Sequence, residues 1–236
     1  SLVFLVAFES LAVTTVMPLV SRELDGASMY ALAFAAPMAS GVIGMVAAGG
    51  WSDRLGPTGP LLASSIVFVI GLLLCGLAPN MQALVVGRLV QGLGGGAITV
   101  ALYVVVARVY VPRLHPKIFA AFAAAWVITS MIGPFAAGLA AQTIGWRWVF
   151  LGVVGLVALA MLAVVPSLRG LSGGENPGNK FAWKPLGWAA LAATAALGMN
   201  LLAEVPGVGT WLMLLSLVLV LIAVRQLFPR KTLLAG

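Results

Sequence analysis

The chain of 236 residues alternates between long apolar segments and short polar turns. About eight segments reach the length of roughly 18 residues at which a helix crosses the hydrocarbon core of a bilayer. The pattern therefore predicts an all-α polytopic membrane protein with about eight spanning helices. These helices are expected at residues 2–20, 28–50, 59–78, 82–108, 118–142, 147–166, 185–203 and 209–228. Pro18 is expected to end the first of them, because proline lacks the N–H that a helix interior uses.

One connection is longer and more polar than the others. Residues 168–184 are rich in Gly, Ser, Asn and Pro, which is the composition of turns and linkers. We therefore predict three parts. They are a six-helix bundle over residues 1–167, a cytoplasmic linker over 168–184, and a two-helix hairpin with the start of the next connection over 185–236.

Composition and charge agree with a membrane protein and fix its expected orientation. Only 8% of the residues are charged, against about a quarter in a soluble domain. The net charge of +7 would suggest nucleic acid in a soluble protein, but these turns are too short for a continuous basic face with aromatic platforms. If the first helix runs outward from the cytoplasm, most basic residues lie on the cytoplasmic side, as the positive-inside rule requires. They are Arg54, Arg108, Arg113, Lys117, Arg169, Lys180, Lys184, Arg225, Arg230 and Lys231.

Two charges lie inside predicted spans and are the first candidates for function. At 1.5 Å per residue, Glu9 is about 16 Å and Gln91 about 14 Å below the outer ends of their helices, and Arg88 is one turn shallower than Gln91. An ion pair or a water-bridged contact between Glu9 and Arg88 is therefore allowed. In the alternative, each charge is satisfied by backbone carbonyls or reaches toward the membrane surface. The glycines beside Arg88 indicate close helix packing.

The segment at the end of the second predicted helix, Gly49-Gly50-Trp51-Ser52-Asp53-Arg54-Leu55-Gly56, resembles the cytoplasmic signature of the major facilitator superfamily. The matching positions are Gly49, Asp53, Arg54 and Gly56. Pro57 and Thr58 replace two basic residues of the signature. The turn is therefore a candidate cytoplasmic gate in which Asp53 pairs with Arg108 or Arg113. The alternative is a solvated turn without a measurable ion pair, since exposed pairs contribute only about 0–1 kcal/mol.

Three more segments are similar to the same family. Gly87-Arg88-x-x-Gln91-Gly92-x-Gly94 resembles its fourth-helix signature, whose arginine is associated with proton coupling. The stretch containing Gly133, Pro134 and Gly138 resembles the fifth-helix signature of antiporters, with Ala137 in place of one glycine. The segment from Glu9 to Pro18 resembles the first helix of the drug:proton antiporters with fourteen helices. The two helices after the first six fit that branch, which implies that the second six-helix half lies outside this sequence.

The resemblance implies a proton-coupled antiporter in a bacterial cytoplasmic membrane that exports lipophilic or drug-like molecules. Glu9 would bind the proton, with Arg88 and Gln91 beside it. Tyr30, Phe34, Met38 and Trp126 could line the substrate path or simply pack. The fifth helix would form a sliding seam against the C-terminal half. The expected partners are the substrate, protons, the lipid bilayer and that second half.

Other functions remain as alternatives or are disfavoured. A related exporter of lipids, siderophores or sugars without proton coupling would have the same fold, and a non-transporting scaffold or complex subunit is a second alternative. An enzyme is not expected, because the sequence contains no nucleophile-base pair or metal cluster. No cofactor or metal is expected, since His115 is the single histidine and has no other ligand close to it in the sequence.

Overall fold

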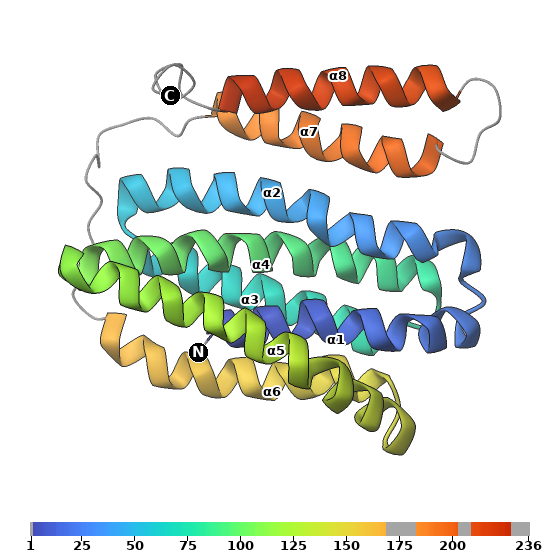
Figure 1. Cartoon of the computed structure of the whole chain (residues 1–236), viewed down its shortest axis with the longest axis horizontal. Coiled ribbons are helices and arrows are strands. Elements are labelled where there is room, and N and C mark those ends of the chain that lie inside the picture. Colours follow the sequence, from blue (N-terminus) through green and yellow to red (C-terminus); the bar gives the residue numbers. More distant parts are fainter. Residues whose placement is uncertain (1, 169–182, 203–208, 228–236) are drawn as a thin grey trace.

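The computed structural model describes residues 2–168, 183–202 and 209–227, and every long element in these ranges is an α-helix (Figure 1). The helices are α1 (Leu2–Glu23), α2 (Tyr30–Leu55), α3 (Thr58–Gly76), α4 (Met81–Val109), α5 (His115–Thr143), α6 (Arg147–Val164), α7 (Trp183–Leu202) and α8 (Gly209–Leu227). Short 3-10 turns lie at Ala27–Met29, Pro112–Leu114 and Val165–Leu168. The predicted all-α fold is confirmed, and the helix bounds agree to within a few residues.

Helices α1 to α6 are long and apolar enough to cross a membrane. The expected spans at 185–203 and 209–228 correspond to α7 and α8, and their passage through the membrane stays a prediction. Most of the predicted linker at 168–184 lies outside the described residues, so the predicted division into three parts also stays a prediction.

The expected end of the first helix at Pro18 is wrong. Helix α1 continues to Glu23 with Pro18 inside it. A proline removes one backbone hydrogen bond of the helix, and membrane helices tolerate this loss when neighbouring helices pack around them. The helix therefore extends about one turn beyond the proline.

The first six helices pack as two groups, one of α2, α3 and α4 and the other of α1 and α5, with α6 in contact with both. Helix α4 lies between α2 and α3, and its contacts with both are the most extensive in the described structure. Helix α1 packs mainly on α5, and α6 contacts both α1 and α3. The α7–α8 hairpin lies along α2, with α7 next to it (Figure 1). Helices α1 and α4, which belong to different groups, share only a narrow contact.

The glycines of α4 allow this helix to touch two neighbours through its backbone. A side chain at Gly92 or Gly96 would overlap the backbone of α2, and one at Gly87 or Gly94 would overlap the backbone of α3. Glycines four residues apart share one face of a helix, and so do glycines seven apart. The glycines of α4 therefore form two separate packing surfaces, one against α2 and one against α3.

Because consecutive helices run in opposite directions, their connecting turns lie at two opposite ends of the bundle. The start of α1 and the α2–α3 and α4–α5 turns lie at one end, and the α1–α2, α3–α4 and α5–α6 turns lie at the other (Figure 1). The α2–α3 turn starts at Gly56, whose φ of 85° lies in the left-handed region that favours glycine. The basic residues of the α2–α3 and α4–α5 turns therefore gather at the same end of the bundle.

A polar contact at the opposite end joins α1 to α6 and to the end of α3. Trp146 Nε1 donates to Glu23 Oε2 at 2.8 Å, and Arg147 Nη1 lies 3.0 Å from Glu23 Oε1. Arg147 also donates to the carbonyl of Ala78 at 3.2 Å and stacks over the Trp146 ring at 4.4 Å. Trp146 is fully buried, whereas the Arg147 and Glu23 side chains are 41% and 48% exposed. These groups, which we call the end clamp, fix the last turn of α1.

Candidate functional site

Helices α1 and α4 bring Glu9 and Arg88 into direct contact inside the bundle. Arg88 Nη1 lies 2.5 Å from Glu9 Oε1 and 2.8 Å from Gln91 Oε1, to which it donates a hydrogen bond. Arg88 Nε donates to the carbonyl of Ala33 on α2 at 3.3 Å. The three side chains are 1–4% exposed. The direct contact between Glu9 and Arg88, which the depths of the two residues in their helices allow, is thus present in the structure. Gln91, one turn further along α4, accepts a second hydrogen bond from Arg88.

This arrangement explains how two charges can lie in an apolar bundle. Removing either ion from water is costly, and only mutual attraction with further hydrogen bonds offsets that cost. Arg88 donates to a carboxylate, a side-chain amide and a backbone carbonyl, which come from three different helices. Charge-assisted bonds of this kind are about twice as strong as neutral ones. The network therefore ties α1, α2 and α4 together, and each charge depends on the other.

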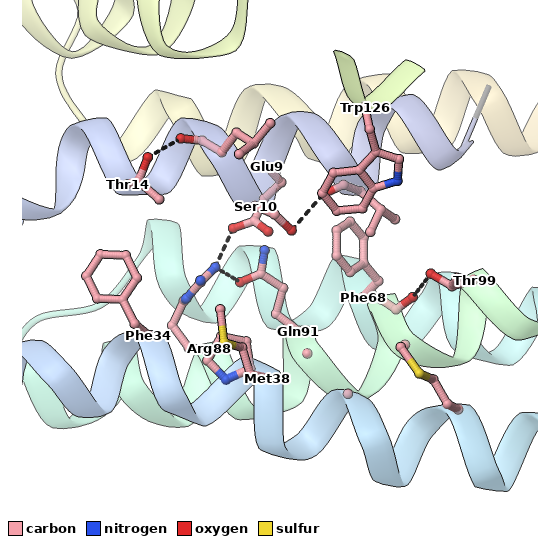
Figure 2. Close-up of a pocket in the computed structure, with 18 residues that line it drawn as sticks. Glu9, Ser10, Thr14, Phe34, Met38, Phe68, Arg88, Gln91, Thr99 and Trp126 are labelled. Carbon is pink, nitrogen blue, oxygen red and sulfur yellow. Dashed lines mark hydrogen bonds and ion pairs between the residues drawn. The ribbon is translucent and has the colours of Figure 1, made fainter. Parts of the chain in front are cut away.

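A cavity of about 400 Å³ lies beside the ion pair, between the two groups of helices (Figure 2). Its size lies within the range of small-molecule sites in proteins. Most of its wall is apolar, and the charged residues on the wall are Glu9 and Arg88. The lining residues are Val6, Glu9, Ser10, Leu11, Thr14, Phe34, Pro37, Met38, Gly41, Met45, Phe68, Arg88, Gln91, Gly92, Gly95, Gly96, Thr99 and Trp126.

The predicted substrate-path residues lie mostly on this wall. Phe34 and Met38 reach it from α2, and Trp126 reaches it from α5. Tyr30 is not part of the lining, and its ring packs against Phe34 with the centroids 5.2 Å apart. Three of the four predicted residues are therefore positioned to touch a molecule in the cavity.

Sequence reasoning missed several lining residues, and helical spacing is the signal that could have found some of them. Gly95 and Thr99 follow Gln91 at intervals of four residues, which places all three on one face of α4. Gly41 and Met45 continue the face of Phe34 and Met38 on α2. Phe68, by contrast, comes from α3, and nothing in its sequence context indicates that this helix reaches the cavity.

The predicted cytoplasmic turn has no ion pair of the expected kind. Among the described residues, the ion pairs are Glu9–Arg88 and Glu23–Arg147, so none joins Asp53 to Arg108 or Arg113. Instead, Arg108 Nη2 donates to the carbonyl of Ser52 at 3.5 Å, and Asp53 is exposed. This hydrogen bond joins α4 to the end of α2 without using the carboxylate. A role of this turn as a gate stays a prediction.

Gly49 and Arg54, two further residues of the predicted gate, lie in the last two turns of α2. Gly49 faces α4, where an added side chain would approach Val100. Arg54 is half-buried, and its Nε has no hydrogen-bond partner in the part of the chain that the structure describes.

The predicted helix-5 glycines pack against α1, and the expected seam of this helix against a second half stays a prediction. Gly133 lies against Phe8 and Leu11 of α1, and Gly138 lies against Thr15 of the same helix. Pro134 lies inside an uninterrupted α5. Small residues in a membrane helix mark the face where another helix approaches, and here that helix is α1 of the same bundle.

These features define a polytopic α-helical integral membrane protein with a buried ion pair on the wall of a cavity that opens to the surface. The structure contains no group of three or more metal-binding side chains within its described residues.

A sequence profile of the Major Facilitator Superfamily matches residues 1–233. The chain therefore belongs to the Major Facilitator Superfamily of transporters.

Individual relatives agree with this assignment. The chain is 30% identical to the multidrug resistance protein 3 of Bacillus subtilis over 159 residues, which cover 67% of this chain and 31% of that protein. It is 30% identical to a probable multidrug-efflux transporter of Mycobacterium tuberculosis over 204 residues, which cover 82% and 43% of the two chains. An uncharacterised transporter of Schizosaccharomyces pombe is 32% identical over 63% of this chain and 25% of its own length. The chain thus spans less than half the length of these relatives.

A solved structure has the same fold. The crystal structure of the POT family transporter PepTSo matches 94% of this chain and 50% of its own, with a TM-score of 0.58 and 18% identity. The helical arrangement is therefore that of a known transporter.

Proposed function

We propose that this chain forms the N-terminal portion of a proton-coupled antiporter that exports lipophilic or drug-like small molecules. The ion pair between Glu9 and Arg88 on the wall of the cavity carries the proposal. Ionisable residues inside a membrane bundle commonly mark proton or substrate pathways. The names of two relatives, a multidrug resistance protein and a probable multidrug-efflux transporter, support the substrate class.

In this proposal Glu9 carries the proton. A proton and the Arg88 guanidinium compete for the same carboxylate, because protonation removes the negative charge that pairs with Arg88. Loading the proton therefore weakens the tie between α1 and α4, and releasing it restores the tie. This links protonation to the separation of the two groups of helices that line the cavity.

The substrate is proposed to occupy the cavity between these groups. Secondary transporters bind their substrates near the middle of the membrane, at the interface of two structural repeats. A second half of the protein would then face the exposed apolar side chains of α5, among them Met131 and Phe135, which are about three-quarters exposed. The basic end of the bundle would face the cytoplasm of a bacterial cell, as the positive-inside rule favours.

The test replaces Glu9 by Gln in the protein reconstituted with both halves. We expect Glu9→Gln to fold, because the amide oxygen still accepts a hydrogen bond from Arg88. Efflux of a fluorescent lipophilic dye should no longer respond to an imposed pH gradient, because the amide cannot carry the proton. Dye flux in proteoliposomes, with and without the gradient, measures this coupling.

Glu23→Gln is the matched control, because Glu23 is the other acid of α1 and lies in the end clamp, away from the cavity. It should retain gradient-driven efflux. Equal coupling in Glu9→Gln and wild type would refute the proton role. Dye flux that ignores the gradient in the wild type as well would favour an uncoupled exporter, and absence of any flux would favour a scaffold.

A further inference from the structure

We propose that the cavity selects lipophilic molecules that carry a hydrogen-bond acceptor. The amide nitrogen of Gln91 is the donor that binds this acceptor. The inference rests on the proposed function, because it names the chemical class of ligand for the same cavity. It assigns Gln91 a second task besides holding Arg88.

The orientation of the Gln91 amide is fixed by its neighbour. A guanidinium has only donors, so Arg88 Nη1 requires the oxygen of the amide, which lies 2.8 Å away. Cys75 Sγ, a weak donor, lies 3.9 Å from the same oxygen. A flipped amide would place its NH₂ group against the guanidinium and lose the bond. The nitrogen Nε2 is therefore forced to point away from Arg88.

That nitrogen is buried and has no hydrogen-bond partner among the described residues. Gln91 is 1% exposed, yet it lines the cavity, and Figure 2 shows its amide between Arg88 and the side chains of α1. A buried donor without a partner costs about 1–3 kcal/mol. An acceptor atom of a molecule in the cavity would remove this cost, so the site favours ligands that supply one.

The hydroxyl groups on the wall cannot replace Gln91 as donors without breaking existing bonds. Ser10 donates to the carbonyl of Val6 at 2.9 Å, Thr14 to that of Leu11 at 2.6 Å, and Thr99 to that of Gly95 at 2.9 Å. Their oxygens still have lone pairs, so toward a ligand they act as acceptors. Gln91 Nε2 is thus a buried donor of a cavity-lining residue that has no partner among the described residues.

The rest of the wall determines the shape of the ligand. Phe34, Phe68 and Trp126 provide aromatic faces, and Met38 and Met45 provide deformable apolar side chains. A flat aromatic molecule with one carbonyl oxygen fits this combination. A site with an unpaired donor discriminates against an analogue that lacks the acceptor, because the donor then stays unpaired.

A matched pair of ligands tests this inference. Fluorenone and fluorene have the same tricyclic shape and differ in a carbonyl group against a methylene group. Equilibrium dialysis against the chain in lipid nanodiscs gives both affinities, with empty nanodiscs subtracted to remove partition into lipid. We expect fluorenone to bind about three- to tenfold more tightly, which is the worth of one neutral hydrogen bond.

Two variants test whether the preference for fluorenone over fluorene depends on Gln91. Gln91→Glu keeps an acceptor for Arg88 but removes the donor. Gln91→Met removes the whole amide while keeping a side chain of similar length. If one variant fails to fold, the other still tests the inference. Both should bring the ratio of the two affinities to one or below. Thr143→Ala is the control, because Thr143 also bonds to its own helix, at Leu139, and lies outside the cavity lining. It should retain the wild-type ratio.

Equal affinities in the wild type, or a ratio that survives in both Gln91 variants, would overturn the inference. So would failure of both ligands to bind. Each of these results is separate from the flux experiment, because pH-driven efflux of a dye depends on Glu9. A chain that lacks the preference but retains coupled efflux would refute the ligand class and leave the proposed function intact.

Discussion

Arg88 bonds to three helices, and no other basic side chain can do the same from its position. Its Nε and Nη1 atoms are used at the same time, by Ala33 on one side and by Glu9 and Gln91 on the other. Lysine presents a single ammonium at the end of a flexible chain and cannot reproduce this fork. At the scale of single residues, the network therefore depends on the shape of the guanidinium as well as on its charge.

Removing only one partner of this pair should be much worse than removing both. We expect Arg88→Met to cost about 3–5 kcal/mol of stability, because Glu9 would stay buried without its counter-charge. Adding Glu9→Gln should recover much of that loss. Thermal unfolding of the wild type, both single variants and the double variant in detergent gives the coupling energy. Additive effects would contradict a direct interaction between the two groups.

In the end clamp, the burial of Trp146 should contribute more to the stability of the protein than the ion pair between Arg147 and Glu23 does. The exposed Arg147–Glu23 pair is worth about 0–1 kcal/mol, so Arg147→Lys should change stability only slightly. Trp146 is fully buried, and Trp146→Ala should cost about 3–5 kcal/mol. Trp146→Phe keeps most of the ring and should cost less than Trp146→Ala. Thermal unfolding ranks the three variants, and an Arg147→Lys effect as large as that of Trp146→Ala would contradict this order.

At the scale of elements, helix α4 is held by backbone contacts that leave no room for a side chain. An added methyl group at Gly96 would overlap Gly41 of α2, and one at Gly92 would overlap Pro37 of the same helix. Rigid backbone on the opposite side cannot move aside as a flexible side chain does. Helices α2 and α4 would have to separate, which also shifts Ala33 relative to Arg88.

We expect Gly96→Ala to destabilise the protein by about 1–3 kcal/mol, the usual cost of overpacking. Gly152→Ala on α6 is the matched control, because nothing lies within 4 Å of the added methyl group. It should be neutral or slightly stabilising, since alanine favours the helix more than glycine. Unfolding temperatures compare the two, and equal effects would mean that α2 and α4 separate easily.

Sequence alone predicts the helices well, because their apolar length is a local property. The contact between Glu9 and Arg88 can also be predicted from the sequence, because the helical rise per residue gives the depth of each group in the membrane. Which face of a membrane helix packs inward is harder to predict. Lipid and protein interior are both apolar, so the packed and lipid-facing sides of a helix such as α5 differ little in sequence. Gly133 and Gly138 of α5, for example, face α1, whereas Met131 and Phe135 of the same helix are exposed.

At the scale of the whole molecule, the charges of the turns predict its orientation in the membrane. Arg54, Arg108, Arg113 and Lys117 lie at one end of the six-helix bundle, and Arg22 and Arg147 lie at the other. The acids of the second end, Glu23 and Asp25, balance its two basic residues. The rule that basic turns stay in the cytoplasm therefore predicts that the start of α1 lies on the cytoplasmic side.

Cysteine labelling tests this orientation. Cys75 is the single cysteine of the sequence and is fully buried, so a membrane-impermeant maleimide should not reach it. In intact spheroplasts, the reagent should label Ser28→Cys in the α1–α2 turn. It should label Leu114→Cys in the α4–α5 turn only after permeabilisation. The reverse result would invert the orientation, and labelling of the unsubstituted chain would contradict the burial of Cys75.

The two glycine faces of α4 also have a consequence for the gene. Every amino-acid change that one nucleotide can cause in a glycine codon introduces a larger residue, because no amino acid is smaller. At Gly87, Gly92, Gly94 and Gly96 each such change meets the backbone of α2 or α3. The codons for these four glycines therefore accept almost no replacement mutations, whereas those for Gly152 and Gly155, which have open space beside them, accept small apolar replacements such as alanine. Deep mutational libraries of the gene should lose variants at these four positions before those at Gly152 and Gly155.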